Sequence, residues 1–290
     1  MRDYILMTDS CCDLSQQMVE DLGLVVLPLS VLQEGKEYRD YPDHRELDPK
    51  VFYQKLRAGA MGSTSAANVE SFREAMEPIL QAGKDILSIN FSSALSTTCQ
   101  SAAMAARELG EQYPEGKMIV IDSLCASLGQ GMLVYLAAQE KAKGKTIDQV
   151  ADFVRETIPH LCHWFTVDDL NHLKRGERVS AAAALFGTML QMKPVLHVDD
   201  EGHLINVAKA RGRKASLLAL ADKVGELAED PAEQLMYISH SDCEEDARFV
   251  ADEVKKRYGV REIRINNIGP VIGAHTGPGC VALFFFGKHR

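Results

Sequence analysis

The chain has 290 residues, of which 46% are hydrophobic and 25% are charged, a balance typical of a folded globular protein rather than a disordered one. Its 32 lysines and arginines against 41 acidic residues give a net charge of −9, which argues against a general nucleic-acid binder. The length fits two domains of ordinary size better than one.

The cysteines and the apolar runs predict a compartment. Seven cysteines are scattered along the chain, and no two form a Cys-x-x-Cys pair, so we expect reduced thiols. The first residues, MRDYILMTDS, turn polar after four apolar side chains, unlike a signal peptide. No apolar run approaches the ~18 residues that a membrane span needs. We therefore expect a cytoplasmic protein.

The first half of the chain alternates short apolar runs with segments of helical periodicity. Strands are predicted at residues 4–7, 25–32, 85–90 and 117–123, and helices at residues 15–22, 47–59, 65–83, 95–109 and 129–144. In helix 47–59, Asp48 is the expected N-cap and Pro49 the first helical residue. Pro78 is expected to bend or break helix 65–83. Strands separated by helices of this length indicate a parallel sheet with helices on both faces.

The pattern changes near residue 160. The small-residue segment 180–190 is predicted to be helical, and residues 193–212 read as a β-hairpin around Asp200-Glu201-Gly202. Helices are then expected at residues 214–229 and 244–259, and strands at residues 234–240 and 261–266. We therefore predict an α/β parallel-sheet domain over residues 1–160 and an α+β domain over residues 161–290. No linker separates them, which suggests close packing with a cleft between the two.

Two glycine motifs resemble nucleotide sites without completing them. Gly129-Gln130-Gly131 follows a strand and opens a helix, but Val134 stands where a dinucleotide fingerprint has its third glycine. Gly144-Lys145-Thr146 resembles the end of a P-loop, yet it joins two helices and reads better as a helix stop followed by an N-cap. Neither motif predicts a cofactor.

A cluster of possible metal ligands is equally incomplete. His160, Cys162 and His163 are close in sequence, but no second group of ligands accompanies them, so a packed core segment is the better interpretation. There is no Gly-x-Ser-x-Gly nucleophile motif. We expect neither a metal nor a cofactor.

Hydroxyl side chains recur where predicted strands end or helices begin. The segments are Thr8-Asp9-Ser10, Ser63-Thr64-Ser65, Ser92-Ser93 and Asp122-Ser123. Ligands of a parallel sheet bind outside the carboxyl ends of its strands, and a helix N-terminus favours a carboxylate or phosphate. Serine and threonine are also the preferred N-caps, so helix capping is an alternative explanation for each segment.

Basic side chains gather in two segments. Lys174, Arg175 and Arg178 lie in one, and Lys209, Arg211, Arg213 and Lys214 lie in the other. In an acidic chain these are local positive patches. They indicate either a site for a ligand anion or an acidic partner, or simply a solvated face.

Taken in order, these segments resemble the DegV family over nearly the whole chain. The resemblance rests on seven motifs: ILMTDSCCDL, GSTSAANVESF, INFSSALSTTCQSA, IVIDSLCASLGQGMLV, VDDLNHLKRGERVS, MKPVLHVDDEGHL and IGPVIGAHTGPGCVALFF. It implies a two-domain DegV-like fold with an N-terminal parallel sheet flanked by helices and a C-terminal α+β domain. It also implies a long-chain fatty acid as ligand, held in an apolar tunnel between the domains.

The family resemblance further implies a binding protein rather than an enzyme. Such proteins are the lipid-presenting subunit of bacterial fatty acid kinase, and a separate ATP-dependent kinase subunit phosphorylates the bound carboxylate to an acyl phosphate used in phospholipid synthesis. The implied partners are therefore a fatty acid and a kinase subunit, with peripheral or transient membrane contact left open.

The resemblance also assigns roles to residues. Thr64, Ser93 and His275 would hold the fatty-acid carboxylate. Secondary candidates at the tunnel mouth, and arginines linked to phosphotransfer or docking, complete the set: Ser65, Ser92, Thr276, Arg178 and Arg211. Small residues in segments 101–106 and 180–190 could leave room for an acyl chain, although alanine-rich helices more often pack closely.

Two positions depart from the family pattern. Ala66 and Ala67 follow Thr-Ser where many members have Gln-Pro, and Glu177 stands where many have glycine. A glutamate adds bulk and negative charge and removes backbone freedom near the proposed mouth, which weakens the assignment of Arg178 more than that of the carboxylate site.

Two other functions remain open from the residues alone. One is a serine hydrolase using Ser93 and His275, with Asp9 or Asp122 orienting the imidazole. The other is a sensor whose output depends on bound lipid. For His275 itself, which we expect in a glycine- and proline-rich turn over residues 273–279, the alternative is a histidine that only stabilises that turn.

Overall fold

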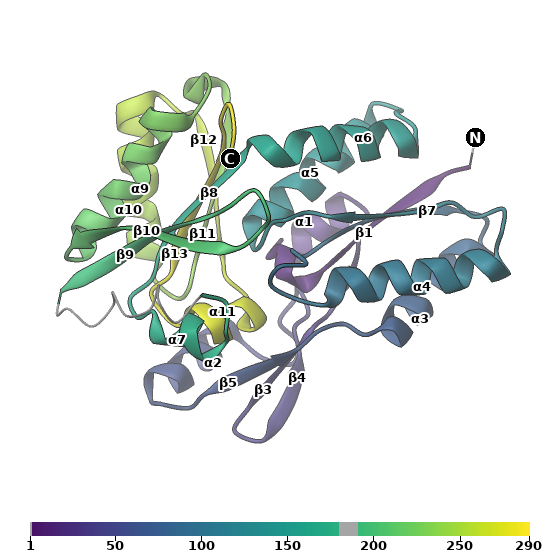
Figure 1. Ribbon diagram of the computed structural model, residues 1–290, viewed down its shortest axis with the longest axis horizontal. Helices are drawn as coiled ribbons and strands as arrows, with labels where there is room; N and C mark the ends of the chain where they lie inside the picture. Colours follow the sequence, from purple (N-terminus) through teal and green to yellow (C-terminus); the bar gives the residue numbers. More distant parts are fainter. Residues whose placement is uncertain (1, 180–190) are drawn as a thin grey trace.

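The computed structural model describes residues 2–179 and 191–290, so the predicted helix 180–190 lies outside the described residues. Within the described part, the strands form three sheets of four, three and six strands (Figure 1). The helices are α1 (Gln16–Asp21), α2 (Pro49–Arg57), α3 (Val69–Gln81), α4 (Thr98–Gln112), α5 (Leu128–Ala142), α6 (Ile147–Thr157), α7 (Asn171–Arg175), α9 (Arg213–Leu227), α10 (Glu244–Tyr258) and α11 (Pro270–Thr276). Short 3-10 helices are η1 (Ser10–Cys12), η2 (Ile158–His160) and η4 (Pro231–Glu233).

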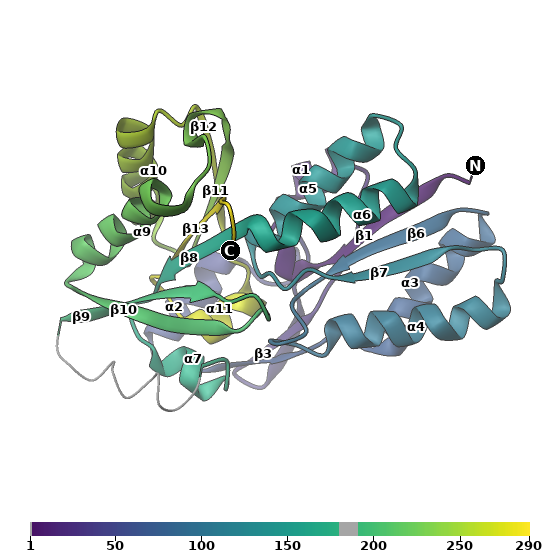
Figure 2. The same ribbon diagram turned by 45° about the horizontal axis from the view of Figure 1, so that its top comes forward.

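The four-stranded sheet is parallel throughout, as the alternation of strands and helices predicts. Its strands are β1 (Tyr4–Asp9), β2 (Val25–Leu27), β6 (Asp85–Asn90) and β7 (Met118–Asp122), in the order β2-β1-β6-β7. Helices α3 and α4 lie on one face, and α5 and α6 lie on the other (Figure 2). Because both faces are covered, β6 is buried at every position.

Local signals place the helix ends well. Asp48 caps α2 by accepting from the Lys50 backbone N–H at 2.7 Å. Thr146 forms a capping box with Gln149 at the start of α6, which confirms the helix stop and N-cap interpretation of residues 144–146. The expected break at Pro78 is wrong, since α3 continues to Gln81.

The apolar run at residues 25–32 is two strands rather than one. Pro28 separates β2 from β3 (Ser30–Gln33), which joins β4 (Lys36–Arg39) and β5 (Gly62–Ser65) in a small antiparallel sheet of order β4-β3-β5. Ser63-Thr64-Ser65 therefore lie on β5 and not at the carboxyl edge of the parallel sheet. Proline lacks the N–H that a continuous ladder needs, so the chain changes sheets there.

The six-stranded sheet contains every strand that the described residues form after residue 160. They are β8 (Leu161–Thr166), β9 (Met192–Val198), β10 (Leu204–Arg211), β11 (Leu235–His240), β12 (Glu262–Asn267) and β13 (Val281–Phe286), in the order β10-β9-β8-β13-β11-β12. β11 and β12 are parallel and the other neighbours antiparallel, which confirms the predicted hairpin β9–β10. Helices α9 and α10 cover one face and enclose their own apolar cluster.

The other face of this sheet turns toward the N-terminal half. Along β8, which is buried at every position, side chains alternate between two apolar clusters: Cys162 and Trp164 pack with α9 and α10, whereas Leu161 and Phe165 join the larger cluster of the N-terminal half. The predicted packed segment is confirmed for Leu161, Cys162 and His163, which are buried, whereas His160 is exposed. The domain boundary near residue 160 stays a prediction. No helix among the described residues is long and apolar enough to span a membrane.

Candidate functional site

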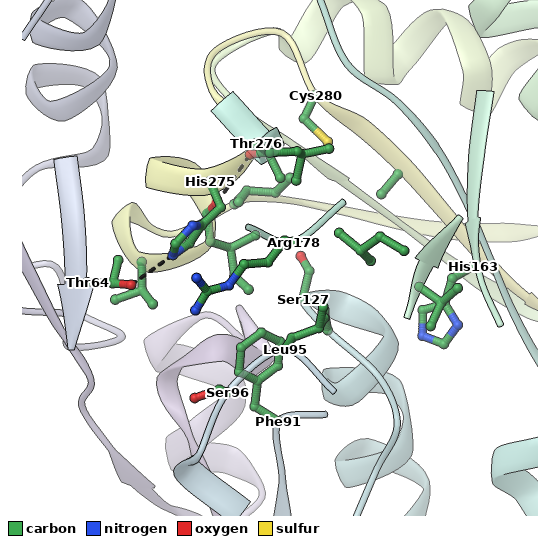
Figure 3. Close-up of a pocket in the computed structure, with 18 of the residues that line it drawn as sticks. Thr64, Phe91, Leu95, Ser96, Ser127, His163, Arg178, His275, Thr276 and Cys280 are labelled. Atoms are coloured by element: carbon green, nitrogen blue, oxygen red, sulfur yellow. Dashed lines mark hydrogen bonds between the residues drawn. The ribbon is translucent and has the colours of Figure 1, made fainter. Parts of the chain in front are cut away.

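A cavity of about 440 Å³ lies between the two larger sheets and α11, within the range that small-molecule sites occupy (Figure 3). Both halves of the chain contribute to its wall. The N-terminal half supplies Thr64, Phe91 and Ser93, and the C-terminal half supplies Arg178 and His275. Hydroxyl, imidazole and guanidinium groups therefore meet in a cavity that is otherwise mostly apolar.

The central polar contact joins residues that are far apart in sequence. Thr64 Oγ1 and His275 Nε2 lie 2.8 Å apart and share a hydrogen bond (Figure 3). On β5, Thr64 is partly buried while its neighbours Ser63 and Ser65 are exposed, because side chains alternate along a strand. Register therefore points the Thr64 hydroxyl toward α11 and directs the Ser65 hydroxyl outward.

His275 lies in the last turn of α11, so the expectation that it sits inside a loop-like turn is wrong. The helix begins with Gly269 and Pro270, and the glycine-rich turn follows it, with φ of 70° at Gly277 and 82° at Gly279. Proline at the first helical position needs no N–H partner, which explains why this segment starts a helix.

Close packing holds both the imidazole and the helix that carries it. A Cβ atom at Gly176 would lie 2.2 Å from His275 Nδ1, so only glycine leaves room for the ring there. Two residues before His275, a Cβ at Gly273 would lie 2.3 Å from the Tyr53 hydroxyl oxygen. That hydroxyl donates to the Ile268 carbonyl at 2.8 Å, tying α2 to the segment that leads into α11.

The charge state of the site follows from burial. Burial, and then the positive charge of Arg178, lower the pKa of His275 to about 4, so the imidazole is neutral near pH 7. Burial also lowers the pKa of Arg178, whose guanidinium donates to the Gly176 carbonyl. A neutral imidazole offers one donor and one acceptor, and the arginine keeps a positive charge. Together they suit a bound carboxylate.

Ser93 lines the cavity, but not from a helix N-terminus as expected. Helix α4 begins at Thr98, and Ser93 belongs to the turn after β6. Its backbone N–H donates to Asp122 Oδ1 at 3.1 Å, which holds the turn against the end of β7. The Asp122 carboxylate thus orients the backbone beside the Ser93 hydroxyl, and it does so at the ligand-binding edge of the parallel sheet.

The remaining candidates divide into two groups. Thr276 lines the cavity and lies 3.2 Å from Ser241 Oγ. Ser65, Ser92 and Arg211 are not among the lining residues. Ser92 is fully buried and donates to the Gly202 carbonyl at 3.1 Å, and Arg211 is exposed at the end of β10. Burial and strand register, rather than residue type, decide which of these candidates line the cavity.

The apolar wall comes from residues to which the sequence assigns no role. Phe91, Leu95, Phe165 and Phe284 lie along it. For Phe165 on β8 and Phe284 on β13, the alternation of side chains along a strand could have indicated which face of the sheet they occupy. The alanines of segment 101–106 are not among the lining residues; Ala102 and Ala105 are fully buried in the core. Close packing is therefore the correct interpretation of that segment.

The contacts lend no support to a serine hydrolase. His275 Nε2 is bonded to Thr64 rather than to Ser93. Asp9 accepts from the backbone of Cys11 and Phe91, and Asp122 accepts from the backbone of Ser93 and Leu124. Neither carboxylate is bonded to His275 among the described residues, so the orienting partner of a triad is not in place.

Comparison with known proteins points to one family. Residues 4–288 match the family model described as "Uncharacterised protein, DegV family". A DegV domain-containing protein of Clostridium perfringens is 47% identical over 290 residues, covering 100% of this chain and 99% of that protein.

Two solved structures have the same fold. A DegV family protein from Thermus thermophilus, described for its fatty acid binding, has a TM-score of 0.88 and 33% identity, with 99% of this chain and 100% of that chain covered. A fatty acid binding DegV protein from Bacillus subtilis has a TM-score of 0.85 and 27% identity, with 99% and 100% covered.

Proposed function

The chain belongs to the DegV family, and on that basis we propose that it binds a long-chain fatty acid in the cavity and presents the carboxylate to a separate ATP-dependent kinase subunit. The observation that carries the proposal is the hydrogen-bonded pair of Thr64 and His275, which lies beside Ser93 and Arg178 in an otherwise apolar cavity.

The physical requirements of a fatty acid match this division of the cavity. A buried carboxylate is costly unless hydrogen bonds satisfy it, and two hydroxyls, an imidazole and a guanidinium are available. An acyl chain gains roughly 0.8 kcal/mol for each CH₂ that it buries. The tail therefore supplies most of the affinity, and the polar residues set the position of the head group.

Presentation to a second protein is supported by the surface beside the cavity. A depression lined by Lys174, Glu177 and His203 shares Arg178 and Leu204 with the cavity wall. Lys174 and Glu177 are exposed. A carboxylate held at Arg178 would thus be near a surface where a kinase subunit can dock and transfer a phosphoryl group to it, giving an acyl phosphate. Arg211 is exposed and would act in docking rather than in lipid binding.

The proposal also covers the domain organisation of the chain and the location of the protein in the cell. We assign residues 1–160 and 161–290 to two domains with the ligand between them. All seven cysteines are free thiols, which is typical of a reducing compartment, and we place the protein in the cytoplasm.

Lipid retention tests the binding step. We expect protein purified without added lipid to carry a long-chain fatty acid that native mass spectrometry detects. Thr64→Ala and Ser93→Ala should each weaken binding about tenfold, because each removes a hydrogen bond to a charged group. Ser65→Ala, the outward neighbour on β5, is the matched control and should bind normally. If the wild type neither carries lipid nor takes up palmitate or oleate, the proposal is wrong.

Reconstitution tests the presentation step. With a cognate kinase subunit and ATP, the loaded protein should yield an acyl phosphate. Arg178→Ala should reduce that yield more than it reduces fatty-acid binding, whereas Arg211→Ala should leave binding unchanged. If the protein binds fatty acid normally but no acyl phosphate forms, fatty-acid binding stands and the proposed partnership with a kinase is wrong.

A further inference from the structure

The end of the β9–β10 hairpin, residues 198–205, lies over one side of the cavity, and we call it the hairpin tip. In Figures 1 and 2 it reaches from the six-stranded sheet toward the N-terminal half. Val198 and Leu204 lie opposite each other on its two strands, and both line the cavity. Leu204 also lines the depression on the surface beside the cavity. The hairpin tip therefore lies between the cavity and the surface.

Two features of the sheet allow the hairpin tip to bend. β9 pairs with its other neighbour, β8, only at Leu196 and His197, so no third strand lies beside the tip among the described residues. The register between β9 and β10 also shifts between Asn206 and Ala208. A β-bulge of this kind interrupts the ladder and bends its strand. Both features lie at the base of the tip, where a hinge would have to be.

A few polar contacts hold the hairpin tip against the N-terminal half. The Ser92 hydroxyl donates to the Gly202 carbonyl at 3.1 Å, and both residues are buried. The Arg290 guanidinium donates to the Asp199 carbonyl in the tip at 3.1 Å and to the Leu124 carbonyl in the N-terminal half at 2.9 Å. Each such bond contributes modestly to stability, so the tip can detach while the rest of the fold stays intact.

The fit of the hairpin tip depends on a glycine. At Gly202 φ is 84°, and a Cβ atom there would lie 2.3 Å from Ser92 Oγ and 3.2 Å from Leu124 Cα. A side chain at this position would therefore push the tip away from the N-terminal half. Gly35, in the turn of the β3–β4 hairpin, has a similar φ of 77°, but a Cβ there would meet no atom within 4 Å. The turn of the β9–β10 hairpin is thus fitted to its neighbours, and the turn of the β3–β4 hairpin is not.

We propose that the hairpin tip is a lid, hinged at the bulge in β10 and held closed by Ser92 and Arg290, which opens to admit and release the fatty acid. The inference rests on the proposed function, because the acid is the ligand that the lid encloses. It separates the roles of two neighbouring serines: Ser93 lines the cavity, whereas Ser92 holds the lid. Opening of the lid then sets the rate of exchange more than the affinity.

The rate of lipid release tests the lid. Protein loaded with a fluorescent fatty acid is mixed with excess oleate, and release is followed by stopped flow. Gly202→Ala forces the tip away from Ser92, and Arg290→Ala removes one of the two groups that hold it, so each should speed release about fivefold. Uptake should speed up similarly, so that Kd changes less than either rate. Release at the wild-type rate in both variants would overturn the inference.

A matched control separates the lid from a general loss of stability. Gly35→Ala makes the same substitution in a hairpin turn at a similar φ, but its Cβ meets no neighbouring atom. It should release the acid at the wild-type rate. If Gly35→Ala speeds release as much as Gly202→Ala does, backbone strain explains the effect and the lid is wrong.

Hydrogen exchange detects the lid without a ligand. In lipid-free protein, the amides of residues 198–205 should exchange faster in Gly202→Ala than in the wild type, whereas those of β11 should not change. If this difference is found but no fatty acid binds, the proposed function is wrong and the moving tip stands. If fatty acid binds but the tip exchanges equally in both proteins, the lid is wrong and fatty-acid binding stands.

Discussion

At the scale of single residues, the site depends on side chains whose geometry only their neighbours explain. Glu177, next to Arg178, has a backbone φ of 59°, in the left-handed region. Glycine takes that conformation without strain, whereas other residues pay roughly 1–2 kcal/mol. The glutamate thus keeps the loop shape that a glycine would give, at a cost in stability.

Replacing this glutamate should stabilise the protein. We expect Glu177→Gly to raise the free energy of unfolding by about 1 kcal/mol, because relief of strain exceeds the extra freedom that glycine has in the unfolded chain. Urea unfolding measures it. Glu177→Ala removes the carboxylate but keeps the Cβ, so it should give no such gain. Equal stabilisation by both variants would show that charge, not backbone strain, is responsible.

The low pKa of His275 predicts a dependence of stability on pH. Its folded pKa of about 4 lies below the unfolded value of ~6.5, so between these pH values the unfolded chain binds a proton that the folded chain does not. The contribution of His275 to stability is therefore complete above pH 6.5 and is lost as the pH falls toward 4. His275→Gln removes this titration.

The test compares wild type and His275→Gln by urea unfolding at pH 7.5 and pH 4.5. We expect the wild type to lose on the order of 2 kcal/mol more than the variant on acidification. Burial raises the pKa of Asp13 and Asp40, which acts in the opposite direction, but both proteins share these groups and the difference cancels them. A difference that does not change with pH would contradict the prediction.

At the scale of elements, α11 is the part that brings the site together. Its seven residues contact β5, α2, β3 and α7, so the helix lies among segments from both halves of the chain. A helix this short has little stability of its own, and its position is set by packing. At Gly273, the Tyr53 hydroxyl occupies the space where a side chain would be.

Filling that space should move the helix. We expect Gly273→Ala to cost about 1–3 kcal/mol of stability through overpacking against Tyr53, and to weaken fatty-acid binding because His275 moves with α11. Gly110→Ala in α4 is the control, since its nearest neighbour, Met118, is 3.9 Å from the new Cβ. Alanine favours a helix, so Gly110→Ala should stabilise slightly. Thermal unfolding and displacement binding measure both effects.

At the scale of the whole molecule, the cavity lies where the two halves are joined by buried hydrogen bonds. The Asp13 carboxylate, just after η1, accepts from the Gly269 backbone N–H at 2.9 Å, and Ser127 Oγ lies 2.9 Å from Ser239 Oγ. Asn266 donates to the Asp13 carbonyl at 2.7 Å. A ligand in the cavity contacts both halves at once, so binding and the stability of the assembled molecule are coupled.

Removal of the lipid should therefore destabilise the protein. A ligand that binds the folded state alone adds about 2.7 kcal/mol at one hundred times its Kd, which corresponds to a rise in Tm on the order of 5–10 °C. We expect extraction of the bound acid to lower Tm by about this amount and added oleate to restore it. In Ser93→Ala, added oleate should raise Tm by less than it does in the wild type. A Tm that does not respond to lipid in the wild type would rule out this coupling.

The sequence by itself determined the elements and the family, because both depend on local patterns. Caps at Asp48 and Thr146 and the apolar periodicities predict most helices and strands, and hydroxyl and histidine motifs identify Thr64, Ser93 and His275 as candidates. These patterns miss two features. One is the break at Pro28, after which the chain enters the separate sheet that contains Thr64, and the other is the helix that contains His275.

Only the tertiary structure decided which candidates meet. Thr64 and His275 are 211 residues apart in sequence and share a hydrogen bond, whereas Ser65, one residue from Thr64, faces away. The reason is physical: proximity and burial come from how sheets and helices pack, and packing depends on the whole chain rather than on any segment of it.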